Sequence, residues 1–261
     1  MQHLVLYDSS NENLVSLGDF VRFIEIIKHE DFLIATSKKN NFFYYFNEKP
    51  TLNINNINYN NYKVINLISG KKIKNAFFDI NNYFKNASIT KETTFKLVEN
   101  FKSIINYKPK ETEKEIKLDQ NSLVGFNWIV PNEWAIKSYP LEKWKYIQEQ
   151  ILKKYKIKIS WQKKDNLESY IKWIKGCNIL ISIVGLGVHL ANYFDKKVIM
   201  LTGPTDFFES NLQKNILKVL PENYCEHRPC NLPTGVNNCG CMPNINPSQV
   251  LNKFEKIVKF N

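Results

Sequence analysis

The sequence predicts an α/β fold built on parallel sheets, and the segment from residue 178 to 206 predicts it most directly. Residues 179–184 are an apolar run with one serine, Ser182, which is typical of a strand buried on both faces. Gly185 and Gly187 then turn the chain into a short helical stretch at 188–194, and residues 198–201 form a second apolar strand. Strand, glycine turn, helix and strand together make one βαβ unit of a parallel sheet.

The two turns of this βαβ unit predict a ligand site. Ligands of parallel sheets bind beyond the carboxyl ends of the strands, where glycine turns and helix N-termini lie. Residues 203–206, Gly-Pro-Thr-Asp, follow the second strand in the way that the glycine turn follows the first. We therefore expect an anionic ligand, most simply a nucleotide diphosphate, against residues 185–189 and 203–206.

The amino-terminal part of the chain shows the same alternation of strands and helices. A helix is predicted from Phe20, because Phe20, Phe23, Ile24 and Ile27 fall on one helical face. The other expected elements are strands at 3–7, 31–36 and 64–68, helical segments at 41–46 and 91–106, and an asparagine-rich loop at 53–62.

Residues 109–117 are charged and lack apolar periodicity, so they are predicted to link two domains. The alternation then restarts, and the last helix is expected to open at Asn246-Pro247, an N-cap followed by proline at the first helical position. The expected domains are residues 1–115 and 116–261, each Rossmann-like. The elements predicted in the second domain, besides the central unit, are strands at 123–128 and 157–161 and helices at 141–154 and 167–175.

Composition indicates a folded protein rather than a disordered one, since 43% of the 261 residues are hydrophobic. No apolar run approaches the roughly 20 residues of a membrane span, and the N-terminus does not resemble a signal peptide, so we expect a cytoplasmic protein.

The net charge of +11 comes almost entirely from lysine, because Arg22 and Arg228 are the only arginines. Nucleic-acid readers favour arginine, so nucleic acid is not an expected partner. Lysines scattered over a solvated surface, or attraction to an anionic membrane or acidic glycolipid, remain open.

The central segment also resembles a known family. His189-Leu190-Ala191 and the Gly-Pro-Thr-Asp at 203–206 are similar to the donor-binding motifs of glycosyltransferase family 9, the ADP-heptose:lipopolysaccharide heptosyltransferases, which typically read D-[ST]-G-x-x-H-L-A and GPT-D. Val184, Gly185 and Leu186 stand where the family has Asp, Ser or Thr, and Gly. The chain therefore departs from the family at a donor-site carboxylate.

The resemblance implies a GT-B fold of two Rossmann-like domains with the active site in the cleft between them. It implies an inverting, metal-independent transfer of a sugar, by resemblance heptose, from a nucleotide-diphosphate sugar such as ADP-heptose. The acceptor would be lipopolysaccharide or another surface glycan, bound by a reduced domain 1–115, with peripheral contact at the inner membrane. The donor would bind to domain 116–261. Both halves are shorter than is usual for the family.

Lys137 lies in a segment, residues 137–144, that resembles the family motif K-x-W-P-x-E-x-W, with Tyr139 in place of its first Trp. The family lysine contacts donor phosphate. A lysine beside a helix that starts at Pro140 would lie near the positive helix N-terminus, where it could offset charge on the leaving nucleoside diphosphate. The alternative is an ordinary surface lysine.

Gly18-Asp19 resembles the family's GD turn, whose aspartate is the proposed base that deprotonates the acceptor hydroxyl. Gly18 would let the backbone approach the ligand. The alternative interpretation of Asp19 is an ordinary N-cap of the helix that follows, and the two roles are compatible.

Other donor contacts are expected around the two turns. His189, in the first turn of the helix, could donate a hydrogen bond to phosphate, or could be a half-buried surface histidine. Thr205 is a candidate phosphate contact, and Asp206 could contact the donor or cap the next helix. Backbone approach is expected at Gly185, Gly187 and Gly203.

Four cysteines lie within seventeen residues: Cys225, Cys230, Cys239 and Cys241. Thiols clustered in this way suggest a structural zinc or iron ion, with His227 as a substitute ligand. Free thiols and disulfides are the alternatives, although disulfides are rare in the cytoplasm. The family often carries a cysteine-rich stretch at this place. Cys177 is expected to be a small buried apolar residue.

Several enzyme classes lack their motif in this sequence. It has no Asp-x-Asp pair, no Walker loop and no Gly-x-Ser-x-Gly elbow. Two hypotheses remain. One is a glycosyltransferase that needs no cofactor for catalysis. The other is a non-catalytic protein that keeps the same fold to bind a glycan or a partner, as the loss of the carboxylate at Val184 suggests.

Overall fold

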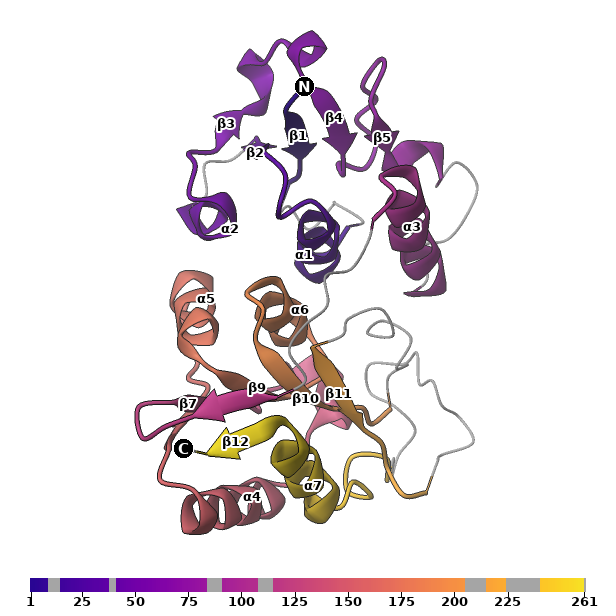
Figure 1. Ribbon diagram of the computed structural model, residues 1–261. Helices are drawn as coiled ribbons and strands as arrows, with labels where there is room; N and C mark the ends of the chain where they lie inside the picture. The colour runs from indigo at the N-terminus through magenta and orange to yellow at the C-terminus, as the bar shows by residue number, and fades with distance from the viewer. Residues whose placement is uncertain are drawn as a thin grey trace. The chain divides into compact units, whose positions relative to one another are not determined.

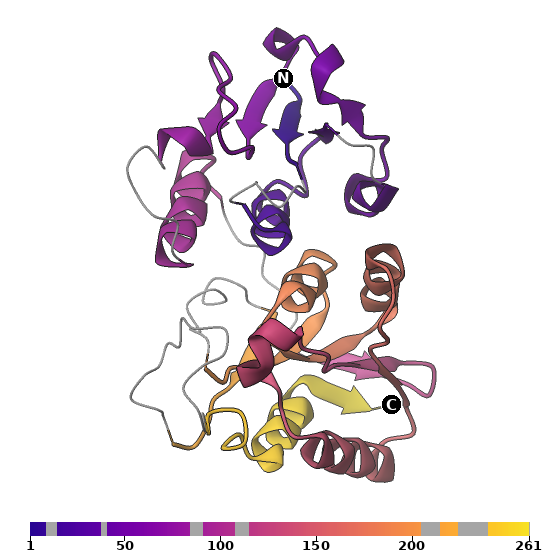
Figure 2. The same ribbon diagram turned by 180° about the vertical axis from the view of Figure 1, so that it is seen from behind.

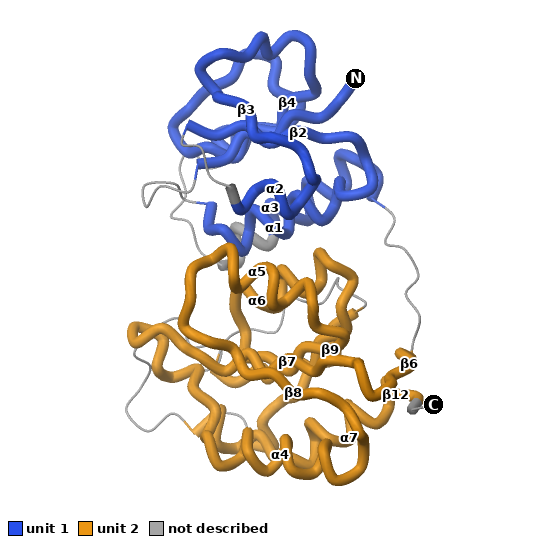
Figure 3. The backbone as a smooth tube through the Cα atoms, turned by 90° about the vertical axis from the view of Figure 1, so that its left-hand side faces the viewer, with its two compact units in different colours: residues 1–108 blue, residues 109–261 orange. Residues whose placement is uncertain are grey.

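The computed structural model describes residues 1–8, 15–37, 41–83, 91–107, 115–204, 215–223 and 240–260. The chain divides into two compact units, residues 1–108 and 109–261 (Figure 3). This division lies close to the boundary expected near residue 115. Among the helices of the described ranges, none is both long and apolar enough to span a membrane.

Unit 1 is built on a parallel sheet of five strands in the order β3-β2-β1-β4-β5 (Figure 1). Its strands and α-helices are β1 (His3–Leu6), α1 (Leu17–Ile26), β2 (Phe32–Thr36), α2 (Tyr44–Asn47), β3 (Leu52–Asn53), β4 (Lys63–Asn66), β5 (Phe78–Asp79) and α3 (Lys91–Ile104). Short 3-10 helices lie at Asn41–Phe43, Ile54–Asn56, Tyr59–Asn61 and Ile80–Asn82. The strands and helices expected from the sequence are thus present.

The centre of this sheet is β1, which pairs with β2 on one side and β4 on the other, so that His3 faces both Phe32 and Lys63. The predicted apolar face of α1 is confirmed, since Phe20 and Phe23 and their apolar neighbours on that face are buried. Aromatic rings fill the space beside them: Tyr7 stacks on Phe20 with ring centroids 4.3 Å apart.

Two sequence-based predictions for unit 1 are wrong in detail. The helix begins at Leu17, not Phe20, because the Ser16 side chain caps it by accepting a hydrogen bond from the Asp19 backbone. Asp19 is therefore a residue of the first turn and not the N-cap. The asparagine-rich segment is also not a plain loop: Asn53 and Asn58 each cap a 3-10 helix with their side chains.

Unit 2 also has a parallel sheet of five strands, in the order β11-β10-β9-β7-β8, and a separate parallel pair, β6 with β12. Its elements are β6 (Ile116–Leu118), β7 (Leu123–Asn127), the 3-10 helix η5 (Asn132–Lys137), α4 (Leu141–Lys154), β8 (Lys158–Trp161), α5 (Leu167–Gly176), β9 (Ile179–Ile183), α6 (Leu186–Tyr193), β10 (Lys197–Leu201), β11 (Ile216–Val219), α7 (Pro247–Ile257) and β12 (Val258–Phe260).

Helices cover both faces of this sheet, as expected of strands such as β9 and β10 that are buried along their whole length. Figures 1 and 2 show α4 with α7 on one face, and α5 with α6 on the other. Trp144, Ile147 and Ile151 of α4 pack with Val250 and Phe254 of α7 in a core that includes the central strands. The result is a three-layer, doubly wound unit.

The central βαβ unit is confirmed, with β9 and β10 in parallel register from Ile179 opposite Lys197 onward. Its helix starts at Leu186, two residues earlier than predicted, with Gly185 as the N-cap. The opening of α7 is confirmed in full: Asn246 caps it in a capping box, with proline at the helix start. Pro140, in contrast, is the N-cap of α4 and not its first residue.

Candidate functional site

The strand order of unit 2 contains one reversal, and it marks the expected ligand edge. The chain runs from β7 to its neighbour β8, then crosses to the other side of β7 to form β9. In such doubly wound sheets, ligands bind beyond the carboxyl ends of the strands at this switch point. The segments after β7 and after β9 flank it. Lys137 lies in the first segment and the turn 184–187 in the second.

A buried polar network fixes the two strand ends at this switch point. The side-chain amide of Asn127, the last residue of β7, donates to Ser182 Oγ in β9 over 2.7 Å. The Tyr170 hydroxyl, from α5, donates to the amide oxygen of the same asparagine over 2.8 Å. Ser182 Oγ in turn donates to the Ile183 carbonyl over 2.7 Å. Burial raises the pKa of Tyr170 well above its usual value, so its hydroxyl remains a proton donor at neutral pH.

The two glycines of the turn have different roles. A methyl group on Gly187 would lie 2.5 Å from Asn127 Nδ2 and closer still to the Tyr170 hydroxyl, so the missing side chain lets α6 pack on the network. At Gly185, in contrast, nothing lies within 4 Å of the same position, and its backbone is extended. Gly187 is thus a packing glycine, whereas Gly185 leaves the start of α6 open to a ligand.

The start of α6 offers the backbone N–H groups that a phosphate needs. The first N–H groups of any α-helix have no partner within the helix and carry a partial positive charge. His189 is the fourth residue of α6 and is buried, with 7% of its surface exposed, so it is not the half-buried surface histidine considered above. Val184, which replaces the family's aspartate, is buried as well. This edge is therefore less acidic than the family motif implies.

Lys137 ends the 3-10 helix η5, and its ammonium lies 4.2 Å from the centre of the Trp134 ring. A cation over an indole face is held by the ring quadrupole. The sequence did not lead us to expect Trp134 as a contact of Lys137. The available signal was its position three residues before that lysine. Tyr139, in the place of the family's Trp, is buried and donates to the Ile245 carbonyl over 3.2 Å. That bond fastens this segment to the turn before α7.

Several predicted residues fall outside the described ranges: Thr205, Asp206, Cys225, His227, Cys230 and Cys239. Of the cysteine cluster, only Cys241 is described, and it is buried. No group of three or more potential metal ligands occurs within the described ranges. Gly203 is buried, and a methyl group there would overlap the side chain of Met242. The described surroundings of Gly203 therefore show a packing role.

Cys177 is buried, as expected. Its thiol donates to the Trp173 carbonyl over 3.3 Å. Burial raises its pKa to about 12, so little thiolate forms at neutral pH. It is an apolar packing residue and not a nucleophile.

Asp19 of unit 1 lies in the first turn of α1, which follows β1. The order of this sheet reverses between β1 and β4, so the N-terminus of α1 also lies at a switch point. Both carboxylate oxygens of Asp19 are engaged: Oδ2 accepts from Ser16 Oγ over 2.6 Å, and Oδ1 accepts from Arg22 over 3.1 Å. Its side chain keeps 20% of its surface exposed, whereas that of Arg22 keeps 5%. Gly18, next to it, is half-buried.

Arg22 is a residue that sequence reasoning missed as part of this site. The signal was its position three residues after Asp19 in a predicted helix, a spacing that brings opposite charges together. On the other side of the switch point, the turn after β4 contains Gly70 with φ 76° and is held by Asn66 and Asn81. This turn carries Lys71, Lys72 and Lys74.

Comparison with known proteins yields a match of fold. No protein-family model and no curated protein sequence matches the chain. E. coli heptosyltransferase WaaC with ADP-2-deoxy-2-fluoro heptose matches with a TM-score of 0.55 at 14% identity, over 98% of this chain and 99% of that one. E. coli ADP-heptose lps heptosyltransferase II matches with a TM-score of 0.57 at 10% identity, over 98% of both chains.

A third similar structure is the bacterial iron-containing dodecameric glycosyltransferase TibC from enterotoxigenic E. coli H10407. It matches with a TM-score of 0.52 at 11% identity, over 98% of this chain and 75% of that one. The family resemblance found in the donor motifs is therefore confirmed at the level of the fold. The chain has the fold of the heptosyltransferases, a GT-B-type fold of two Rossmann-like units with parallel sheets.

Proposed function

We propose that this protein is a glycosyltransferase that transfers a sugar from a nucleotide-diphosphate sugar to a glycan acceptor. One observation carries the proposal. The part of the donor motif that contains His189 follows β9, at the switch point of unit 2, in a chain whose fold matches heptosyltransferases along nearly its full length. One of those neighbours, WaaC, is described in solved structures with ADP and with ADP-2-deoxy-2-fluoro heptose, which supports ADP-heptose or a similar donor here.

The donor diphosphate would bind at the start of α6. Backbone N–H groups beyond Gly185 would donate to phosphate oxygens, and His189 and Thr205 would add side-chain contacts. Lys137 would leave its place over Trp134 to pair with the phosphates, where an ammonium offsets the charge of the leaving nucleoside diphosphate. Because the chain has no Asp-x-Asp pair, we propose that this charge is held without a metal ion.

The proposed chemistry is an inverting displacement. The acceptor hydroxyl oxygen attacks the anomeric carbon, and the bond from that carbon to the β-phosphate oxygen breaks. The hydroxyl proton passes to Asp19, and the nucleoside diphosphate leaves with the bonding electrons. Asp19 suits this role because its carboxylate is held in place by Ser16 and Arg22 and is still partly exposed.

The acceptor is proposed to be lipopolysaccharide or another bacterial surface glycolipid, met by a cytoplasmic protein at the inner membrane. The cysteines at 225–241 are proposed to hold a structural zinc or iron ion that takes no part in transfer. TibC, one of the similar structures, is described as iron-containing, which supports this part of the proposal. Elemental analysis of protein purified without chelator should give about one metal per chain. A fully folded protein without metal would contradict it.

The test of the function is a panel of nucleotide-diphosphate sugars, with release of the nucleoside diphosphate as the signal. We expect turnover with one donor in the presence of a glycan acceptor, and a raised melting temperature with the same donor. If no donor raises the melting temperature, the donor site is wrong. If a donor binds but is never turned over with any acceptor, the second candidate is favoured, a non-catalytic glycan- or partner-binding protein. The observation behind that candidate is the buried Val184 in place of the family's aspartate.

A further inference from the structure

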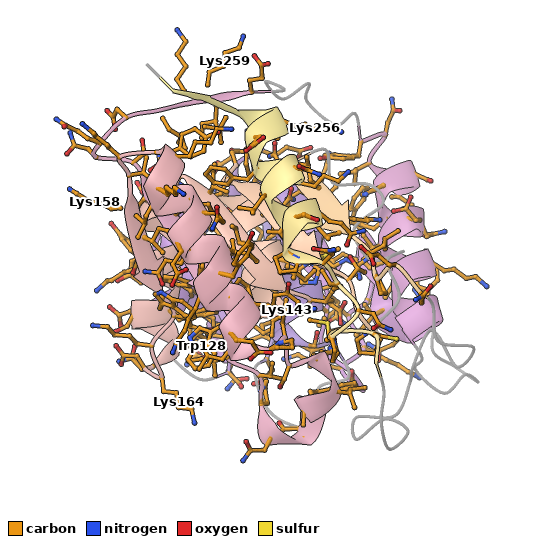
Figure 4. The ribbon with its side chains drawn as sticks, turned by 90° about the horizontal axis from the view of Figure 1, so that it is seen from below. Trp128, Lys143, Lys158, Lys164, Lys256 and Lys259 are labelled. Carbon is orange, nitrogen blue, oxygen red and sulfur yellow. The ribbon has the colours of Figure 1, made fainter. Side chains whose placement is uncertain are left out.

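One face of unit 2 carries an excess of positive charge. The helices α4 and α7, which cover this face, contain six lysines and three glutamates. Further lysines project from the edges of the sheets beside them, among them Lys158 and Lys259. Figure 4 looks onto α4 and α7 and shows Lys143, Lys158, Lys256 and Lys259 around them.

Many of these lysines are not neutralised by the protein itself. Lys154 pairs with Glu255 over 2.7 Å, and Lys259 pairs with Glu115. The Lys143 ammonium donates a hydrogen bond to a backbone carbonyl, that of Ile245, over 3.2 Å. Six others have no carboxylate partner among the described residues: Lys145, Lys153, Lys156, Lys158, Lys253 and Lys256.

The opposite face of the same sheet is different. Its helices, α5 and α6, carry two lysines and one glutamate. Lys172 pairs with Glu168 over 2.9 Å, and Lys175 lies over the Phe194 ring at 5.9 Å. Among these four helices, the lysines that have neither a carboxylate partner nor an aromatic ring contact in the described ranges therefore lie on α4 and α7 and not on α5 and α6.

Apolar side chains accompany the lysines on this face. Leu141, Tyr146 and Leu152 of α4 are exposed by 43%, 48% and 44%. Between the ends of α4 and α7 lies a groove of about 370 Å³, whose lining includes Tyr155 and Leu251 beside Lys153. Lysines interspersed with exposed apolar and tyrosine side chains are typical of a surface that rests on anionic lipid headgroups.

We propose that the α4/α7 face of unit 2 docks on an anionic lipid bilayer. The ammonium groups of lysine are compact point charges, and the negative surface potential of such a bilayer attracts them. Arginine, which nucleic-acid-binding proteins favour, does not occur on either helix. The proposal deepens the proposed function, whose acceptor is a membrane glycolipid. Its test needs no sugar transfer, so the two can fail separately.

The test is sedimentation of the full chain with vesicles of phosphatidylcholine alone or of phosphatidylcholine with phosphatidylglycerol. We expect binding to the anionic vesicles only, and weaker binding as salt is raised. Because each lysine near an anionic surface contributes roughly a fivefold factor, Lys153→Gln with Lys256→Gln should lower the partition coefficient about 30-fold. The matched control, Lys172→Gln with Lys175→Gln, has the same net charge and should lower it less than about threefold.

Three results would overturn the proposal. The first is equal binding to both kinds of vesicle, and the second is an equal loss in the two double variants, since either removes the role of this face. The third is binding of duplex DNA or RNA at the same salt, lost in the first variant, without any vesicle binding. All four lysines are on the surface, and circular dichroism of both variants checks that they fold. If vesicle binding fails while donor turnover with a soluble acceptor persists, only the docking proposal is lost.

Discussion

The two units carry similar sheets, but their ligand edges are held in different ways. In unit 2, bonds between separate elements fix the edge: Asn127 of β7 joins Ser182 of β9 and Tyr170 of α5, and Gly187 packs α6 against them. In unit 1, the described side-chain bonds of Asp19 stay within the helix start, to Ser16 and Arg22. Substitutions at the unit 2 edge should therefore cost stability, whereas substitution of Asp19 should cost mainly rate.

The largest expected effect comes from Asp19→Asn. Loss of the general base should lower the rate of transfer about 10²-fold or more. The free energy of unfolding should change by only about 1–2 kcal/mol, because the amide oxygen of asparagine can still accept from Arg22 while its Nδ2 can donate to Ser16 Oγ. Steady-state kinetics and urea unfolding measure the two effects. Glu25→Gln, on the same helix, is the matched control and should keep the rate; an unchanged rate in the Asp19 variant would exclude it as the base.

The next effect separates the two glycines of the unit 2 turn. Gly187→Ala should lower the free energy of unfolding by about 1–3 kcal/mol, because its methyl group would collide with Asn127 and Tyr170. Gly185→Ala meets open space and should cost about 1 kcal/mol or less, from a weaker helix cap, while it lowers donor affinity. Urea unfolding and donor titration distinguish the variants. Equal stability of both would mean that the edge is not packed as described.

Alkaline pH tests the buried network through Tyr170. Its pKa is raised by burial, so its contribution to stability is complete below the unfolded value, near 10, and is lost as pH rises above that value toward the folded pKa. Each such tyrosine lowers the free energy of unfolding by about 1.4 kcal/mol per pH unit in this window. Tyr170→Phe should give a shallower decline above pH 10, with Tyr7, Tyr139 and Cys177, whose pKa values burial also raises, contributing to the remainder. An identical slope would place Tyr170 in contact with solvent.

The smallest effects come from two helix caps. Ser16→Ala in unit 1 and Asn246→Ala in unit 2 should each cost about 1 kcal/mol in urea unfolding, since each removes one capping bond. Only the first should also slow transfer, because Ser16 holds Asp19. If both variants, or neither, lose activity beyond what their stability explains, Ser16 has no special part in the site.

Much of the fold could be predicted because hydrophobic period and glycine turns are local signals. The run 179–184, the helical face of Phe20 and its neighbours, and the cap at Asn246 each specify their element without any tertiary information. The same signals give the order of the elements along the chain but not the order of the strands within each sheet. The switch points that place Asp19 and the turn 184–187 at ligand edges appear only in the structure.

The parts of the site that escaped prediction depend on contacts between distant residues. Nothing local shows that Asn127 would meet Ser182, 55 positions further along, or that Gly187 is a packing glycine. The ion pair of Arg22 with Asp19 could have been predicted, because Asp19 lies one helical turn before Arg22. The burial of His189 depends on how α6 packs, which its sequence alone does not determine.

The most direct test of the account is hydrogen–deuterium exchange with and without a nucleoside diphosphate. The diphosphate is proposed to bind at the carboxyl edge of unit 2, against the N-terminus of α6 and the segment that carries Lys137. Exchange should therefore be slower at residues 184–189 and 128–138, with no change in the turn after β4 of unit 1. Protection confined to unit 1, or protection nowhere at a saturating ligand concentration, would contradict it.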